Sequence, residues 1–221
     1  MSFSARIHAL FRDPVSGLTH LVGAALGLLG LLYLVEETNP LHSTRHTAAA
    51  VVFGVSMILL YLSSAAYHLL HVAPETRLVL RRIDHALIFT LIAGSYTPYC
   101  LVTLKETWGP KLLIVIWGVA VFGLLLSIFW IQAPRWLTTA LYLSMGWMIV
   151  FIYPTLKQFL DPNALTWLWI GGFSYSLGAI IYAIKWPNPY PPVFGFHEIW
   201  HLFVLGGSAS HFVSVLIALK A

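Results

Sequence analysis

Seven apolar runs, each about 20 residues long, occupy nearly the whole 221-residue chain and leave only short loops between them. They extend over approximately 17–36, 47–70, 83–104, 111–131, 136–158, 164–185 and 197–220. A helix needs roughly 20 apolar residues to cross a hydrocarbon core about 30 Å thick, so each run is long enough for one crossing. The runs are continuously apolar rather than alternating, and lipid offers no partner to the open backbone groups of a sheet edge. The chain is therefore expected to be all-α, a polytopic membrane protein with a seven-transmembrane helix bundle.

The composition excludes a water-soluble protein and leaves no room for a second domain. Charged residues make up 9% of the chain and hydrophobic residues 59%, whereas an ordinary soluble domain has about 25% charged residues. The whole chain, 1–221, is expected to form one transmembrane domain, a multi-pass protein of the inner or plasma membrane. Its net charge is +4, but the basic residues are scattered at the ends of the runs, which argues against a nucleic-acid partner. The sequence leaves the oligomeric state open, a homo-oligomer included.

The distribution of the basic residues predicts the orientation in the membrane. Cytoplasmic loops of membrane proteins carry an excess of Lys and Arg. A cytoplasmic N-terminus places seven of them inside, namely Arg6, Arg12, Arg77, Arg81, Arg82, Arg135 and Lys185. It places five outside, namely Arg45, Lys105, Lys111, Lys157 and Lys220. The excess favours a cytoplasmic N-terminus and an outside C-terminus.

Ionisable residues that fall within the apolar runs gather at one end of the predicted bundle. A charged group at the centre of a membrane helix costs at least about 2.5–3.5 kcal/mol, so its presence needs a reason. Successive helices cross the membrane in opposite directions. The starts of the odd-numbered runs therefore lie on the same side of the membrane as the ends of the even-numbered runs. By this rule one layer, on the cytoplasmic side, contains His20, His68, Asp84, His85, His197 and His201.

The last run opens with His197-Glu198-Ile199-Trp200-His201, whose two histidines are four residues apart. On a helix their β-carbons lie about 5–6 Å apart, which suits two imidazoles that bind one tetrahedral ion. His68 is the best third ligand, and Ser64 shares its helix face. Three imidazoles favour Zn²⁺ with an open fourth position, although the residue types leave Fe, Ni and Cu open. His20, His85 and Glu198 are candidates for positions next to the ligands or the substrate.

The same histidine spacing occurs in zinc proteases, but the third ligand of their standard classes is missing. No Asp or Glu follows His201, and Gly207 stands six positions later, where a metzincin has its third histidine. An intramembrane protease with Asp84 as third ligand and Glu198 as general base remains an alternative.

Four motifs together resemble the haemolysin III branch of the progestin and adipoQ receptor family. They are Thr19-His20-x-x-Gly23, Ser63-Ser64-Ala65-Ala66-Tyr67-His68, Asp84-His85-Ala86-x-Ile88-Phe89 with Ala93-Gly94-Ser95-Tyr96-Thr97-Pro98, and His197-Glu198-x-x-His201. The resemblance covers essentially the full chain. It implies a seven-helix bundle with an internal N-terminus and a zinc ion near the cytoplasmic face, held by His68, His197 and His201. It also implies that Asp84 holds a zinc-bound water, with Ser64 beside the site. Glu198 stands where the related adiponectin receptors often have an amide, so its role is left open.

The related adiponectin receptors and alkaline ceramidases resemble lipid amide hydrolases. The leading hypothesis is therefore that this chain is a zinc hydrolase that cleaves an amide or ester bond of a lipid. Asp84 would act as general base, and Ser64 would steady the oxyanion or bond back to its own helix. A second hypothesis is a non-enzymatic sensor or regulator, in which Asp84 closes a structural zinc site. A third is a pore-forming haemolysin, but no ring of charges along a helix supports a pore.

Overall fold

The seven apolar runs form seven helical spans in the computed structural model, which describes residues 9–41, 43–191 and 193–220. All seven are long and apolar enough to cross a membrane. Their bounds are Pro14–Thr38 (α2), Thr44–Leu69 (α3), Pro74–Thr103 (α4 and a π-helical end), Gly109–Phe129 (α5), Arg135–Phe159 (α6, a 3-10 segment and α7), Pro162–Ile184 (α8) and Phe196–Lys220 (α9). The prediction of an all-α, seven-helix membrane protein is confirmed; Arg6, one of the residues used for its orientation, lies outside the described part.

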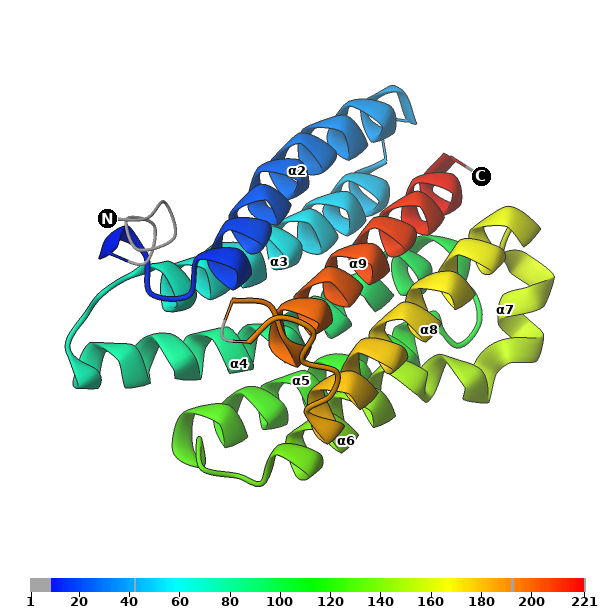
Figure 1. The fold of residues 1–221 in the computed structure, drawn as a ribbon. Helices are drawn as coiled ribbons and strands as arrows, with labels where there is room; N and C mark the ends of the chain where they lie inside the picture. Colours follow the sequence, from blue (N-terminus) through cyan, green and yellow to red (C-terminus); the bar gives the residue numbers. More distant parts are fainter. Residues whose placement is uncertain (1–8, 42, 192, 221) are drawn as a thin grey trace.

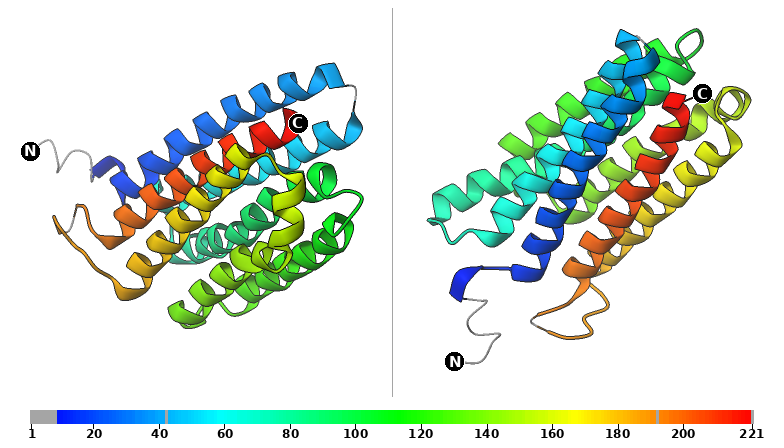
Figure 2. Two further views of the ribbon diagram at one scale, coloured as in Figure 1. Left: turned by 90° about the vertical axis from the view of Figure 1, so that its right-hand side faces the viewer. Right: turned by 90° about the horizontal axis from the view of Figure 1, so that it is seen from above.

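The spans pack side by side along one common axis, and the start of α2 and the end of α9 lie at opposite ends of the bundle (Figure 1). The last helix, α9, contacts α2, α3, α4 and α8, so it forms the centre of the bundle. The two turned views in Figure 2 show α9 between the α2–α3 pair and α8. We call the end where α2, α4 and α9 begin the histidine end, because His20, His68 and His197 lie there.

Hydroxyl groups connect α9 to its neighbours. The Tyr61 hydroxyl of α3 donates a hydrogen bond to Ser208 Oγ (2.6 Å), and the Tyr175 hydroxyl of α8 lies 2.7 Å from the same oxygen. The Tyr99 hydroxyl donates to Ser214 Oγ at 2.7 Å. Helices in a membrane associate through close packing and such interhelical hydrogen bonds rather than through exclusion of water. These bonds fix the depth of α9, and therefore of the histidines at its start.

The start of α4 differs from the sequence prediction. The helix begins at Pro74, nine residues before the predicted start at residue 83. Proline is favoured in a first helical turn because its missing N–H would have no partner there. Arg77, Arg81 and Arg82, which were expected in a loop, therefore lie on a helix. Hydropathy detects only the apolar part of a helix, and this helix begins with polar turns.

The fifth span is not one continuous α-helix. It consists of α6 (Arg135–Gly146), a 3-10 segment (Trp147–Ile152) and α7 (Tyr153–Phe159). Backbone groups that such a change frees inside a membrane need other partners. The hydroxyl of Tyr96 supplies them, because it donates to the carbonyl oxygen of Gly146 (2.6 Å) and accepts from the N–H of Ile149 (3.0 Å). The break is therefore stabilised by a specific contact from α4.

The positive charges predict that the histidine end faces the cytoplasm. We expect Glu75→Cys, at the exposed start of α4, to react with a membrane-impermeant maleimide only after cells are lysed. Glu106→Cys, exposed at the opposite end, serves as the matched control and should react in intact cells. Both variants are made with Cys100→Ala to remove the native thiol. Labelling of Glu75→Cys in intact cells, with Glu106→Cys protected, would show that the histidine end faces outward and contradict the predicted orientation.

Candidate metal centre

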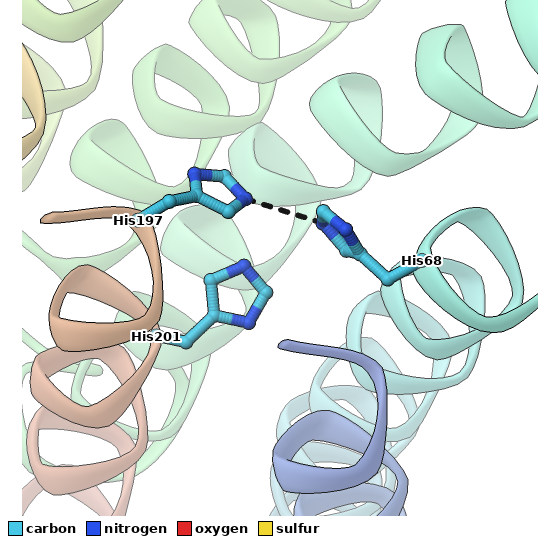
Figure 3. Close-up of side chains that lie close together, drawn as sticks. All are labelled: His68, His197 and His201. Carbon is cyan, nitrogen blue, oxygen red and sulfur yellow. Dashed lines mark hydrogen bonds between the residues drawn. The ribbon is translucent and has the colours of Figure 1, made fainter. Parts of the chain in front are cut away.

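Three histidines from two helices converge at the histidine end of the bundle. His68 lies near the end of α3, and His197 and His201 lie in the first two turns of α9. One nitrogen of each ring lies within 4.8 Å of a nitrogen of both others, and Figure 3 shows the three rings turned toward a common point. Nε2 of His68 and Nε2 of His197 are 3.3 Å apart. Two ligands at about 2.0–2.1 Å from one tetrahedral ion are themselves separated by about 3.3 Å, so the spacing fits a shared zinc ion.

His201 gives a second indication of a metal. Its side chain is fully buried, and neither of its ring nitrogens has a hydrogen-bond partner among the described residues. A buried polar nitrogen without a partner costs roughly 1–3 kcal/mol. Coordination to an ion would satisfy one of the two nitrogens, and this residue therefore fits the role of ligand that the sequence predicted.

Asp13 is a functional candidate that the sequence analysis did not identify. It directly precedes α2, and its carboxylate accepts a hydrogen bond from Nδ1 of His68 (3.2 Å) and another from Arg12 (2.6 Å). A proton on Nδ1 leaves Nε2 of His68 free, which is the tautomer that a metal requires. Partial burial alone would raise the pKa of Asp13, but the hydrogen bonds from His68 and Arg12 outweigh it and lower the pKa below its ordinary value. The carboxylate is therefore ionised at neutral pH and can orient His68.

His20 and Ser64, both candidates from the sequence, lie beside the three histidines. Nδ1 of His20 is 2.8 Å from Ser64 Oγ, and the His20 ring stacks on His201 with ring centroids 3.8 Å apart. Both side chains are buried. Because His20 makes these contacts from α2 and Ser64 makes them from α3, the pair joins two helices next to the cluster. Its arrangement places the Ser64 hydroxyl at the edge of the site.

Asp84 lies in an apolar cavity that opens next to this pair. The cavity has a volume of about 130 Å³ and is lined by His20, Ser64 and Asp84 at the histidine end. Asp84 is buried, with 7% of its surface exposed, and is not part of the three-histidine cluster. Apolar side chains line most of the remaining wall, and His211 also lines it, ten residues after His201 on α9 and therefore about 15 Å further along that helix. The site is thus a mainly apolar chamber that carries an imidazole, a hydroxyl and a carboxyl group at the histidine end.

Two further candidates from the sequence occupy other positions. The Glu198 carboxylate accepts hydrogen bonds from the Ser16 hydroxyl and the Gly195 N–H, both at 2.8 Å. It therefore caps the start of α9 and connects it to α2, which positions the ligands that follow. His85 lines a separate, smaller pocket with Arg81 rather than the apolar cavity. Glu198 therefore acts on the position of the helix that carries His197 and His201, and the His85 side chain lines a different pocket from Asp84.

Comparison with known proteins agrees with the family that the sequence motifs resemble. Residues 8–212 match the model of the family described as haemolysin-III related. A haemolysin-3 homologue from Bacillus subtilis (strain 168) is 38% identical over 92% of both chains, and haemolysin-3 from Bacillus cereus is 39% identical over 92% of this chain and 90% of its own. The adiponectin receptor protein of Drosophila melanogaster is 25% identical over 96% of this chain and 52% of its own. With its seven spans, the chain therefore belongs to the haemolysin-III-related family of multi-pass cell membrane proteins.

Proposed function

We propose that the protein is a zinc-dependent membrane hydrolase that cleaves an amide or ester bond of a lipid. The observation that carries the proposal is the convergence of three imidazoles next to an apolar cavity that also contains a buried carboxylate. His68, His197 and His201 would hold the zinc ion, because neutral imidazoles suit zinc better than hard cations. Asp84 lies outside this group of ligands, which supports an open catalytic site over a closed structural one.

Bound zinc would supply a Lewis acid that polarises a carbonyl group and lowers the pKa of water. Asp84 would orient the attacking water and accept its proton as the oxygen adds to the carbonyl carbon. The same carboxyl would then return the proton to the leaving nitrogen or oxygen as the scissile bond breaks. Ser64 would accept a hydrogen bond from His20 and donate a hydrogen bond to the oxyanion.

The shape of the cavity supports a lipid as substrate. Its wall is formed mainly by apolar side chains such as Leu60, Ile88 and Val204, and its acid, Asp84, lies at the end beside the metal centre. An acyl chain placed along this wall would bring its carbonyl group to Asp84 and Ser64. The 3-10 segment that begins at Trp147 also borders the cavity, so the break in the fifth span shapes the binding site.

Metal content tests the ligand set directly. We expect the detergent-purified protein to contain close to one zinc ion per chain by mass spectrometry, and His68→Ala and His197→Ala to lose it because two imidazoles hold zinc weakly. His46→Ala serves as control, since this histidine lies at the opposite end of the bundle. Protein that is free of zinc when purified without chelators, or equal losses in the control, would contradict the assignment.

Removal of the Asp13 carboxylate should weaken zinc binding without removing a ligand. We expect Asp13→Ala to reduce the zinc affinity by about 10–100-fold, because partners of metal-bound histidines contribute effects of this size. Asp13→Asn keeps an oxygen that can accept from His68, so its zinc affinity should lie between those of wild type and Asp13→Ala. Competition with a fluorescent chelator gives the affinities. Asp161→Ala removes a carboxylate that caps α8 at the opposite end and should leave the affinity unchanged; equal effects of Asp13→Ala and Asp161→Ala would refute the role of Asp13.

Hydrolysis is tested by incubation of the zinc-loaded protein with ceramides and other acyl lipids, and released fatty acid is measured by mass spectrometry. Asp84→Asn should retain zinc but lower turnover by about 10²–10⁴-fold, the usual contribution of a general base. The control Glu106→Gln changes an exposed acid at the other end. A wild-type protein inert toward the whole panel would argue against the hydrolase, and loss of zinc from Asp84→Asn would indicate a closed structural site.

A further inference from the structure

A second, smaller pocket lies at the histidine end, separate from the cavity that contains Asp84. The start of α4, the end of α5, the start of α6 and the end of α8 form its walls, and its volume is about 40 Å³. One water molecule needs about 10–15 Å³ on this measure, so the pocket has room for a group of phosphate size. Its polar lining comprises Arg81, His85, Ser127, Arg135, Thr138 and Tyr182.

The charge of this pocket is entirely positive. Arg81 and Arg135 line it, and no Asp or Glu is among its described lining residues. Neither arginine forms an ion pair with an acid within the described ranges. Asp84 follows Arg81 by three residues on α4, but its side chain lines the larger cavity. Because arginine stays protonated in proteins, two guanidinium groups in a pocket that no acidic side chain lines favour a bound anion.

Arg135 is held in position for such a ligand. Its guanidinium carbon lies 4.5 Å from the centroid of the Tyr182 ring and 5.7 Å from that of Phe196, and both contacts are cation–π interactions. Its Nη1 is buried and has no hydrogen-bond partner in the described part of the chain. A buried charged donor without an acceptor is unfavourable. The planar guanidinium fork matches the oxygens of a phosphate, so the geometry of Arg135 itself indicates the kind of ligand.

We propose that this pocket binds a phosphate group, with Arg135 as the principal ligand and Arg81 as the second positive charge. The group belongs either to an anionic lipid headgroup or to a soluble phosphate. Trp130 lines the pocket and Trp136 adjoins it in sequence, and both are exposed, which is typical of the membrane interface where headgroups lie. The site requires neither zinc nor turnover, and it therefore stands independently of the proposed hydrolase.

The site also lies next to the metal centre. The ring of Tyr182 contacts Arg135 on one side, and its centroid is 5.9 Å from that of the His197 ring. A phosphate held by Arg135 would therefore be separated from a zinc ligand by one aromatic ring. A lipid headgroup bound here would therefore lie close to the three-histidine cluster.

Binding is measured on the full-length, detergent-purified protein with two probes. Inorganic phosphate is titrated against chloride at equal ionic strength and followed by tryptophan fluorescence, and phosphatidic acid is compared with diacylglycerol by native mass spectrometry. We expect wild type to bind at least one phosphate probe and to bind phosphatidic acid in preference to diacylglycerol if the source is a lipid. Arg135→Gln should weaken this binding by about tenfold or more, since it removes a charge-assisted interaction.

Arg77→Gln is the matched control, because Arg77 is exposed on α4 one turn before Arg81 and does not line the pocket. It should change binding by less than about twofold, as rim charges contribute little. Arg81→Gln tests the second charge, and Arg135→Lys, which keeps the charge but loses the fork, should fall between wild type and Arg135→Gln. The His68→Ala variant should bind as wild type does. If Arg77→Gln and Arg135→Gln weaken binding equally, the binding reflects general surface charge and the proposal is overturned. The proposal is also overturned if wild type binds neither probe.

Discussion

A membrane interior offers no water to polar groups, and this constraint explains where the polar residues of this protein lie. Each one that enters a span must find a partner within the protein. Tyr96 provides partners for the backbone where the fifth span changes to a 3-10 helix, and Ser208 of α9 accepts from Tyr61 of α3. His201 and His211 stand out, because both ring nitrogens of each are buried and lack a hydrogen-bond partner among the described residues. A metal ion at the three-histidine cluster would supply a partner for one ring nitrogen of His201.

The histidine end is held together by contacts that connect α2, α3 and α9. The Asp13 carboxylate is hydrogen-bonded to His68, and the Ser16 hydroxyl is hydrogen-bonded to Glu198. The His20 ring is hydrogen-bonded to Ser64 and also stacks on the ring of His201. Each contact joins a residue at the start of α2 to one of the helices that carry the proposed zinc ligands. Helix α2 therefore acts as a scaffold for the site, although it contributes none of the three histidines. A change in these contacts would move the imidazoles relative to one another, and zinc affinity depends on their spacing.

The spans and the layer of ionisable residues could be predicted from the sequence, because both depend on hydropathy and on the direction in which successive helices cross. His68, His197 and His201 were identified in this way, and the structure brings them together. Asp13 was missed because it lies outside every apolar run, and only its position one residue before α2 marked its depth. The direction of the His85 side chain depends on helix rotation, which depth alone does not determine.

The central claim, that His68, His197 and His201 share one zinc ion at the end of an apolar cavity, is tested most directly by X-ray absorption at the zinc edge on the purified protein. The account predicts a first shell of nitrogen and oxygen at about 2.0–2.1 Å with the outer-shell scattering of imidazole rings. It also predicts that this imidazole signal decreases in His201→Ala. A first shell without imidazole scattering, or a spectrum that His201→Ala leaves unchanged, would contradict it.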